Sequence, residues 1–578
     1  MINPRLRKLT IRNFRSIGSQ DVDIELDDIV VLVGPNNAGK SSILRAYEVV
    51  MSEGSAQGKL TLQDFPNEVI DNENKPTIIV ESVVYEEHEP GPEWILTDDS
   101  SKETYIKEKW EWEQEGAPKR VGWSNKLNDW HQTKKPWGAP NVAQAYRPEP
   151  HRVDAFADPE KQSSEIVKLL HKALTDRVKD LSAQKNDEPS PYEQLLANVA
   201  ELQKMVLGDV SEQIAEVEKD VEGLVRKVFP NYKIVFDAKP EDDLDKCINL
   251  FKNQPDLRLG PTDGYLTEIS KQGSGARRTL LWAALRILSE HNRIISKKSV
   301  ERPHVLLLDE PELCLHPNAV RDACKVLYDL PVDTNWQVMV TTHSPAFIDL
   351  SRDNTSIIRV ERSDTGIIKG TTIYRPQRAK LEEDDKVNLK LLNIFDPNVA
   401  EFFFGGKNVL VEGDTEYTAF KHVIAKHPAE FSDVNIIRAR GKATLVSLAK
   451  ILNQFGSPYA LLHDSDRPFC KQKDLTKKPR KNSAWTTNEN IQKVVEVPKE
   501  KGLVRLVASV PNLEEAFFGE EAANEKPYSA LVTISKNENK EFDTLKDLLV
   551  ALTDFTKPLP ENALEWEVLG DLEEGLKD

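Results

Sequence analysis

A glycine-bearing loop between a buried strand and a helix constrains this chain most. Residues 34–41 read Gly-Pro-Asn-Asn-Ala-Gly-Lys-Ser and fit the pattern G-x-x-x-x-G-K-[ST]. They follow the apolar run 29–33, which predicts a strand buried on both faces, and we expect a helix to begin near Lys40. Backbone N–H groups of such a loop bind phosphate oxygens, together with the helix N-terminus. The segment therefore predicts an α/β nucleotide-binding domain that takes ATP and Mg²⁺.

The loop supplies most of the predicted ATP contacts. Lys40 is expected to neutralise the β- and γ-phosphates, and the Ser41 hydroxyl to bind Mg²⁺. The full set of predicted contacts from the loop is Asn36, Asn37, Gly39, Lys40, Ser41 and Ser42.

A second apolar strand, residues 305–308, ends in two acids. Asp309 is expected to hold Mg²⁺, directly or through water, and Glu310 to polarise the attacking water as a catalytic residue. The next predicted strand, 337–340, is followed by Thr-Thr-His-Ser-Pro. In this order of motifs we expect His343 to sense the γ-phosphate; a purely structural histidine is the alternative.

The segment Gln-Gly-Ser-Gly-Ala-Arg-Arg at 272–278 precedes these acids and opens a predicted helix. It resembles the ABC signature, although it departs from the usual Leu-Ser-Gly-Gly-Gln. The resemblance implies that Ser274 and Gly275 bind the γ-phosphate held by a second ATPase head, so the ATPase should work as a dimer. Gln63 is a candidate for the Q-loop contact; a plain loop after the first helix is the alternative.

Size and composition limit the number of folded units and the classes of protein to be considered. A chain of 578 residues is too long for one core, so two to four folded units are expected. Its net charge of −18 argues against coating DNA with the whole surface, but leaves room for a local basic groove. The four scattered cysteines indicate neither a disulfide framework nor a zinc site, which favours a reducing cytoplasm. We expect no secretory signal and no membrane span, since no long uncharged apolar stretch occurs.

The predicted class is α/β, with an ABC-type ATPase head followed by a second α/β domain. Residues 160–228 have helical spacing and dense charge, which predicts an antiparallel helical insertion, either a dimerisation arm or a solvated arm. Residues 376–400 are charged and look irregular, which indicates a linker. The tryptophan-rich stretch 110–137 fits no clear pattern. The expected domains are 1–159 and 229–375 for the ATPase, 160–228 for the insertion, 376–400 for the linker, and 401–578 for the second domain with a C-terminal extension.

The second domain begins with another strand, glycine turn and helix, at 407–416. Glu412 ends the strand and Glu416 lies one helical turn later, so both carboxylates can face one point. A further strand ends in Asp464 and Asp466, and alternate residues of an extended strand point the same way. Four carboxylates packed together repel one another unless a cation neutralises them, and oxygen ligands favour Mg²⁺ or Mn²⁺ over zinc.

A third strand, 503–508, precedes two more acids, of which one could complete a second metal site. We favour Glu514 and keep Glu515 as the alternative. A helix N-terminus with favourable acids would explain both without any metal. Lys526 is a candidate for contact with a substrate phosphate, and would be catalytic together with Glu412, Asp464 and Asp466.

A cluster of cations follows Asp466, with very few acids among them. Beside a carboxylate metal site, such a cluster predicts contact with a nucleic-acid backbone; a solvated basic loop is the alternative. Its members are Arg467, Lys471, Lys473, Lys477, Lys478, Arg480 and Lys481. Trp485 nearby could stack on a base, but packing is the favoured role.

The Glu-Gly turn and the Asp-x-Asp strand end together resemble the Toprim fold, and the whole chain resembles the OLD (overcoming lysogenisation defect) family of nucleases. The resemblance implies an ATP-regulated, divalent-metal-dependent DNA endonuclease with a two-metal mechanism. It also implies a homodimer or higher homo-oligomer whose helical insertion is the dimerisation domain. Many relatives act in antiphage defence, with a helicase-like partner as in Gabija systems, or with a reverse transcriptase and multicopy DNA as in retrons. The sequence leaves both settings open.

Two other classes of protein share parts of this pattern. An SMC/RecF-like ATP-dependent DNA-binding clamp with an inactive Toprim domain is the main alternative, and the intact acids disfavour it. A topoisomerase or primase relative is disfavoured as well, because no tyrosine-bearing cleavage domain or zinc-binding segment is evident in the sequence.

Overall fold

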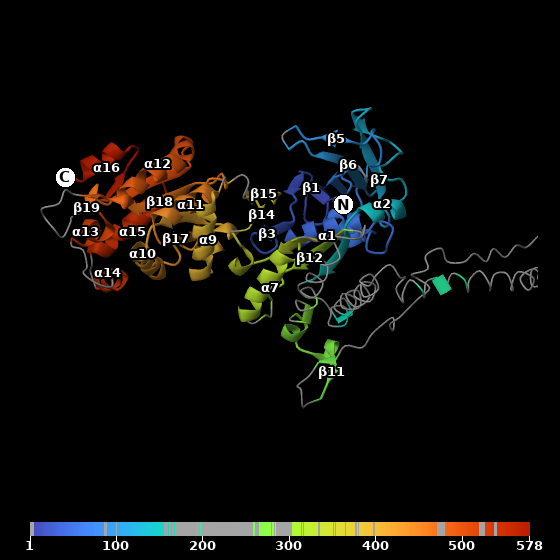
Figure 1. Cartoon of the computed structure of the whole chain (residues 1–578), viewed down its shortest axis with the longest axis horizontal. Coiled ribbons are helices and arrows are strands. Elements are labelled where there is room, and N and C mark those ends of the chain that lie inside the picture. The colour runs from blue at the N-terminus through green and yellow to red at the C-terminus, as the bar shows by residue number, and fades with distance from the viewer. Residues whose placement is uncertain are drawn as a thin grey trace, which may run out of the picture. The chain divides into compact units, whose positions relative to one another are not determined.

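The chain divides into two compact units, one made of residues 1–156 and 300–578 and the other of residues 157–299. A computed structural model describes most of the first unit and short parts of the second (Figure 1). The described stretches are 5–85, 89–99, 101–154, 258–259, 265–278, 303–313, 317–332, 336–350, 354–363, 366–375, 381–396, 399–470, 480–519, 526–536 and 540–577, with the further positions 160, 163–164, 167, 194, 197–198, 201, 280–281, 284, 315, 352 and 379.

An antiparallel sheet forms the beginning of the chain, drawn in blue to cyan in Figure 1. In spatial order its strands are β2 (Val22–Glu25), β1 (Arg5–Arg12), β4 (Thr77–Val83), β6 (Thr104–Glu111), β7 (Lys119–Ser124) and β8 (Asp129–Trp130), with β5 (Leu96–Thr97) beside β6. Alternate residues of β6 are buried, as expected of a strand with one face on the core. The sheet also places the tryptophan-rich stretch, because Trp110 on β6 is buried in the core shared with β1.

Buried charges connect this sheet to the helix α2 (Pro140–Tyr146). The guanidinium of Arg147 donates to Glu53 at 3.0 Å and to Glu108 at 2.7 Å. Arg120 approaches the same two carboxylates at 3.3 and 3.5 Å. Each of the four side chains is almost wholly buried, so each charge needs the opposite charge beside it.

A second, mostly parallel sheet carries the nucleotide motifs. Its strands in spatial order are β15 (Ile368–Tyr374), β14 (Thr355–Arg362), β3 (Ile29–Val33), β13 (Trp336–Thr341), β12 (His304–Asp309) and β9 (Glu149–Val153). Only the pairing of β15 with β14 is antiparallel. The strands predicted at 29–33, 305–308 and 337–340 are confirmed as β3, β12 and β13, every residue of which is buried. Because β13 lies between β3 and β12, the carboxyl ends of all three strands meet at one edge.

Helices follow two of these strands. The predicted helix after the loop is α1 (Lys40–Met51), whose apolar residues share one core with β1, β3 and β12. The helix α7 (Pro317–Asp329) follows β12.

The second unit is described in part. β10 (Arg258–Leu259) pairs with β11 (Thr267–Glu268), the 3₁₀ helix η4 (Ile269–Lys271) follows, and residues 274–278 are helical. The predicted insertion 160–228 lies outside the described residues, apart from a few helical positions between 160 and 201. The dimerisation role of the insertion stays a prediction.

The expectation of an irregular segment at 376–400 is wrong. Residues Glu383–Phe395 form the helix α9, and the 3₁₀ helix η6 (Val399–Phe404) follows. The acids that suggested a linker begin the helix, since Glu382 and Asp385 form a capping box at its N-terminus. Asp385 also accepts hydrogen bonds from Ser447 and Lys450, both at 2.6 Å.

The C-terminal part, orange to red in Figure 1, contains a third sheet with the strand order β17 (Val434–Arg438), β16 (Lys407–Val411), β18 (Tyr459–Asp464), β21 (Val504–Ser509) and β22 (Ala563–Glu565). All strands are parallel except β22. One face is packed against α10 (Asp414–Lys426), α13 (Leu513–Phe518), α14 (Lys526–Ile534) and α15 (Lys540–Thr553). Two further helices, α11 (Lys442–Leu452) and α12 (Ser483–Glu500), pack against each other, and α12 against β21.

Residues 540–575 also contribute to this domain. The helix α15 supplies Leu545, Leu548 and Leu549 to its core, and the short helix α16 (Leu569–Gly575) follows β22. The buried indole of Trp566 donates to Nε2 of His463 at 3.0 Å. Among the helices of the described residues, none is both long and apolar enough to cross a membrane.

Candidate functional site

The nucleotide loop joins β3 to α1 and depends on its glycines. Gly34 has a φ of 136°, and a Cβ atom there would lie 2.0 Å from the carbonyl oxygen of Val360. Gly39 has a φ of 101°, which side chains rarely adopt. Asn36 and Asn37 are exposed between them, and Asn37 also has a positive φ of 60°. The two glycines therefore allow a tight turn that residues with a side chain could not adopt at these positions.

Lys40 begins α1 and turns back over the loop. Its ammonium donates to the carbonyl oxygens of Gly34 at 3.0 Å and Pro35 at 2.9 Å, and lies 3.0 Å from Nε2 of His343. Burial lowers the pKa of Lys40, while the nearby carboxylates, Glu310 first, oppose that shift. The lysine is thus a cation surrounded by groups from three predicted motifs.

The strand end of β12 brings the two predicted acids to the same place. The Asp309 carboxylate accepts from Ser41 at 3.1 Å and from Thr341 at 2.6 Å. Glu310, with a φ of 44°, lies 3.4 Å from Nε2 of His343. Lys40, Ser41, Asp309, Glu310 and His343 therefore form one cluster, as the motifs predicted.

Glu312, which was not predicted as a site residue, also belongs to this cluster. Glu312 accepts from the backbone N–H of His343 at 2.7 Å and from the Thr342 hydroxyl at 2.8 Å, so it fixes the histidine loop. Ser42, a predicted ATP contact, has its hydroxyl 3.1 Å from that of Ser16. The sequence signal for Glu312 is its place directly after the strand-end acids.

The other predicted ATP contacts are Gln63, Ser274 and Gly275. Gln63 is exposed in the 3₁₀ helix η1 (Leu62–Asp64), and its neighbour Asp64 is the buried residue, paired with Arg15 at 2.8 Å. Ser274 and Gly275 begin a helix in the other compact unit, so their contact with a second head stays a prediction.

A second cluster lies at the carboxyl edge of the third sheet. Glu412 follows β16, Glu416 lies in the first turn of α10, Asp464 ends β18, and Glu514 lies in the first turn of α13 after β21. Because β16, β18 and β21 are neighbours in parallel register, their ends bring these acids together. The backbone N–H of Asp464 donates to Glu412 at 3.2 Å, and that of Leu513 donates to Asp464 at 2.9 Å.

The electrostatics of these acids are unfavourable. Burial raises the pKa of Glu412 to about 7 and that of Glu416 to about 7, and for Glu416 the charges of Glu412 and Glu514 add to the effect. The pKa of Asp464 is raised well above its ordinary value by burial and then by the charges of Glu416 and Glu412. Carboxylates in this state gain from a cation that replaces their protons.

Asp466 reaches the cluster in another way than expected. The prediction that Asp464 and Asp466 share an extended strand is wrong, because β18 ends at Asp464 and Asp466 has a φ of 59°. Its carboxylate pairs with the buried ammonium of Lys442. Both charges act on the pKa of Glu412, Lys442 lowering it and Asp466 raising it. Asp466 is therefore linked to the other acids through a lysine.

Lys442 is a site residue that sequence reasoning missed. It begins α11 directly after β17, the neighbour of β16, and the N–H of Gly441 donates to the backbone oxygen of Glu412 at 2.9 Å. A glycine and a lysine that follow a parallel strand and open a helix were the available signal.

The spacing of the acids limits how they can hold metal. In the described part of the chain, no three of them bring one carboxylate oxygen each within 4.8 Å of one another. A single ion would require side-chain rotation toward it, or two ions would have to share the acids. The donor set itself, carboxylate oxygen only, suits Mg²⁺ or Mn²⁺.

Glu514 and Glu515, which follow β21, have different surroundings. Glu514 is buried and accepts from the Thr415 hydroxyl at 3.2 Å. Glu515 instead pairs with Arg467 at 3.1 Å. Lys526, at the start of α14, has its ammonium 3.7 Å from Glu514. Of the two alternatives, Glu514 lies with the other acids, and Lys526 lies at the margin of the cluster.

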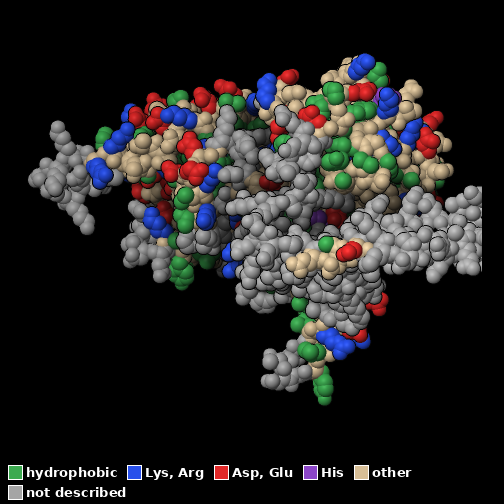
Figure 2. Space-filling model, turned by 45° about the vertical axis from the view of Figure 1, so that its right-hand side comes forward, with side chains coloured by type: hydrophobic (Ala, Val, Ile, Leu, Met, Phe, Trp, Pro, Cys, Tyr) green, Lys and Arg blue, Asp and Glu red, His purple; other side chains and the backbone are tan. Residues whose placement is uncertain are grey.

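The predicted basic segment is described only at its ends. Arg467 is exposed, and Arg480 and Lys481 are exposed on β20 (Arg480–Lys481), which pairs with β19 (Phe469–Cys470). Lys471, Lys473, Lys477 and Lys478 lie outside the described residues. Trp485 is buried in α12, which agrees with a packing role. Figure 2 shows basic and acidic side chains interspersed over the described part of the face in view.

The fold and the two clusters define an ATPase joined to a Toprim domain. Residues 5–348 match the AAA ATPase domain family, and residues 403–466 match the Toprim domain of overcoming lysogenization defect protein-like proteins. The chain belongs to the AAA ATPase domain family and, with its Toprim domain, to the OLD family of ATPase–Toprim nucleases. The predicted α/β class and family resemblance are confirmed.

Similar proteins cover most of the chain. The Old nuclease of Escherichia phage P2 is 26% identical over 483 residues, which are 80% of this chain and 77% of that protein. The OLD nuclease of Thermus scotoductus (strain ATCC 700910 / SA-01) is 23% identical over 582 residues, covering 96% of this chain and 100% of that protein. The solved Smc head bound to the C-winged helix domain of ScpA aligns with a TM-score of 0.36 and 16% identity, over 63% of this chain and 97% of that one.

Proposed function

We propose that this protein is a divalent-metal-dependent DNA endonuclease whose cleavage is regulated by ATP. The gathering of Glu412, Glu416, Asp464 and Glu514 at one sheet edge carries the proposal. Burial and mutual repulsion make their ionised forms costly, and a divalent cation removes that cost while fixing their orientation. Both OLD nucleases among the relatives carry the activity in their names, which agrees with this proposal.

The chemistry divides between the carboxylates and two lysines. Bound Mg²⁺ or Mn²⁺ would supply an activated water and stabilise the leaving oxygen. Glu412, Asp464 and Glu514 would hold the ions, with Glu416 beside them. Lys526 lies next to Glu514 and is 41% exposed, so its ammonium can also meet a phosphate from solvent. Lys442 holds Asp466 in place and partly neutralises the centre.

The basic segment after Asp466 would bind the DNA backbone. In the sequence its cations stand between the acid-bearing strand β18 and the helix α12, and the described members Arg467, Arg480 and Lys481 are exposed. Phosphate contacts of this kind position a duplex without reading its sequence. We therefore expect binding that weakens as salt increases.

ATP and Mg²⁺ would bind at the cluster of Lys40, Ser41, Asp309 and His343, with Glu310 orienting the attacking water. Two contacts support a route from this cluster to the Toprim domain. The ring of His343 lies 6.5 Å from that of Phe404, at the end of η6. Arg359 on β14 donates to the backbone oxygens of Phe402 and Phe403, each at 3.0 Å. Residues 405 and 406 then connect Phe404 to β16, and Glu412 follows that strand.

The family resemblance supports a proposal about assembly and setting. We propose a homodimer or higher homo-oligomer, paired through the heads, with Ser274 and Gly275 completing the partner's nucleotide site. We also propose a cytoplasmic effector role in antiphage defence, with a helicase-like protein or a reverse transcriptase and its multicopy DNA as partner. Plaque counts with and without the neighbouring genes test this role, and loss of protection without them identifies the partner.

Plasmid nicking tests the activity itself. Supercoiled DNA incubated with the protein and Mg²⁺ or Mn²⁺ should become nicked or linear, and a chelator should prevent this. An SMC/RecF-like clamp with an inactive Toprim domain would bind the plasmid and leave it closed. Binding without cleavage under both ions would therefore replace our proposal by that alternative.

A further inference from the structure

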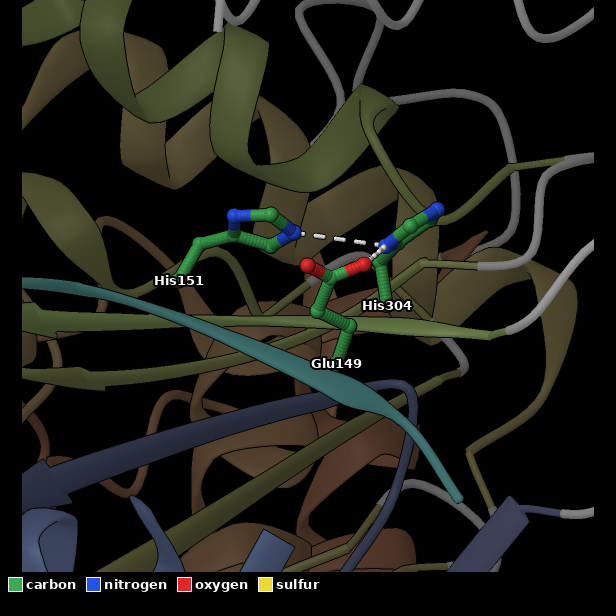
Figure 3. A group of neighbouring side chains, drawn as sticks. All are labelled: Glu149, His151 and His304. Carbon is green, nitrogen blue, oxygen red and sulfur yellow. Dashed lines mark hydrogen bonds and ion pairs between the residues drawn. The ribbon is translucent and has the colours of Figure 1, made fainter. Parts of the chain in front are cut away.

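A group of three potential metal ligands lies in the ATPase sheet, apart from both clusters described above. Glu149, His151 and His304 each offer one ligand atom, and these atoms all lie within 4.8 Å of one another. In the described part of the chain they are the one such group of histidine, cysteine and acidic side chains. Figure 3 shows the three side chains converging, with Nε2 of His151 and a Glu149 oxygen both directed at Nδ1 of His304.

Strand register brings the three residues together. Glu149 and His151 are alternate residues of β9, so they point to the same face of the sheet. His304 on β12 is the direct partner of Glu149, and Trp336 on β13 is the direct partner of His304. Parallel neighbours in register share a face. All four side chains therefore lie together at the amino ends of three adjacent strands.

The two imidazoles are fixed before any ligand arrives. Trp336 is buried and its ring lies 5.1 Å from His151 and 4.8 Å from His304, tilted by about 30° to each. Such packing restricts ring rotation, so the two nitrogens keep their directions. Preorganised ligands lose little entropy when an ion binds.

We propose that Glu149, His151 and His304 form a zinc site. Two ligand atoms at about 2.0–2.1 Å from a tetrahedral Zn²⁺ lie about 3.3–3.4 Å apart. The nitrogens of His151 and His304 are 3.2 Å apart, and Glu149 lies 3.7 Å from His304. The carboxylate is thus too far for a good hydrogen bond, yet close to the spacing of a shared ion. Two nitrogens and one oxygen suit Zn²⁺ and not Mg²⁺.

The three proposed ligands differ in solvent exposure, which indicates how an ion could reach them. The His304 side chain is 5% exposed, whereas that of Glu149 is 44% exposed. An ion can therefore enter from the Glu149 side and keep a water as its fourth ligand. The cysteine count could not reveal this site, because the site contains no cysteine. No local sequence motif revealed it either, because its two histidines are 153 positions apart and meet only through strand pairing.

The place of the site in the fold indicates what zinc would do. His304 and Asp309 occupy opposite ends of β12, roughly 16 Å apart at about 3.3 Å per residue. The ion is therefore separate from the nucleotide Mg²⁺. β9 is the strand before residues 157–299, and β12 is the strand after them. Zinc would join the edge strand β9 to β12 where the chain returns to the sheet, and so stabilise the ATPase core.

Zinc retention by the full-length protein tests the inference. The protein is stripped with a chelator, exposed to Zn²⁺ in a large excess of Mg²⁺ to fill oxygen-only sites, dialysed, and analysed for metal. We expect one retained zinc per chain and a higher unfolding temperature with zinc. His304→Gln should weaken zinc binding by at least about tenfold and remove the temperature shift. If His304→Gln fails to fold, the partly exposed His151→Gln serves in its place.

Two matched variants separate this site from others. His422→Gln changes a histidine on α10 and should keep the zinc. Asp464→Asn changes the carboxylate centre and should keep it as well. The inference is overturned if the unmodified protein retains no zinc, if both His304→Gln and His151→Gln retain it equally, or if Asp464→Asn alone loses it.

Discussion

The ammonium of Lys40 lies 3.0 Å from Nε2 of His343, although 303 positions separate the two residues. An ammonium group can only donate, so Nε2 accepts and the imidazole carries its proton on Nδ1. The same Nε2 lies 3.4 Å from Glu310, the proposed water-orienting residue. His343 therefore lies beside both Lys40 and Glu310, and its ring faces that of Phe404, in the segment that precedes the Toprim domain.

Replacing Lys40 should abolish ATP turnover. Lys40→Ala removes the cation that would neutralise the β- and γ-phosphates, so hydrolysis measured by phosphate release should fall to background. Lys493→Ala, which removes an exposed lysine of α12, is the matched control and should hydrolyse ATP normally. Normal turnover by Lys40→Ala would refute the phosphate-loop assignment.

Asp464→Asn should abolish DNA cleavage while ATP hydrolysis continues. The change keeps the side-chain shape and removes a charge from the centre of the carboxylate cluster, so bound metal is lost or misplaced. Nicking of supercoiled plasmid measures the loss of DNA cleavage, and phosphate release from the same preparation measures the retained ATP hydrolysis. Asp433→Asn, on the surface beside Lys407, should cut like the unmodified protein. Cleavage by Asp464→Asn at the normal rate would show that the metal assignment is wrong.

The neighbouring acids Glu514 and Glu515 provide a matched pair. Glu514→Gln should reduce cleavage strongly, because Glu514 is buried beside Glu416 and Asp464. Glu515→Gln should leave cleavage within about twofold, since an exposed ion pair such as that of Glu515 with Arg467 contributes little. Initial nicking rates at saturating Mg²⁺ make the comparison. A strong loss of cleavage in Glu515→Gln with little loss in Glu514→Gln would show that Glu515, and not Glu514, is the metal ligand.

Without metal, the carboxylate centre should lose stability as pH rises. The pKa of Glu416 is about 7 in the folded chain, against an ordinary value of 4.5, so the unfolded chain releases its proton first. Ionisation between pH 4.5 and 7 therefore favours unfolding, by up to about 1.4 kcal/mol per pKa unit. In a chelator, Glu416→Gln should be more stable than the unmodified protein at pH 8, and the difference should shrink toward pH 5.

Added Mg²⁺ should reverse that order at pH 8. The cation stabilises the ionised acids of the unmodified protein and has fewer charges to bind in Glu416→Gln. The unfolding temperatures of the unmodified protein and of Glu416→Gln are measured at several pH values, once with chelator and once with Mg²⁺. A stability difference that does not change with pH would contradict the raised pKa.

Phe404→Ala should uncouple ATP from cleavage. The ring of Phe404 faces His343, and the next residues lead to β16 and Glu412, so its removal should keep ATP hydrolysis and abolish the effect of ATP on nicking. The measurement is the ratio of nicking rates with and without ATP. Leu391→Ala, at an exposed apolar position of α9, should keep that ratio. An unchanged ratio in Phe404→Ala would place the coupling elsewhere.

Local patterns in the sequence predicted much of the fold. The buried strands β3 and β12 were predicted from apolar runs, because a strand covered on both faces consists mostly of apolar side chains. The helix α9 was not, because acids mark a helix N-terminus as readily as a solvated loop. The tryptophan-rich stretch was not placed either, since its burial depends on partners distant in sequence.

The sequence by itself determined the chemistry available at each strand end. Asp309, Glu412 and Asp464 follow apolar runs, and that order alone predicts acids at the carboxyl edge of a parallel sheet. Only the tertiary structure decided which groups meet there. It brought Lys442 to Asp466, separated Glu514 from Glu515, and placed His151 beside His304, because such contacts depend on strand order and register between segments far apart in the chain.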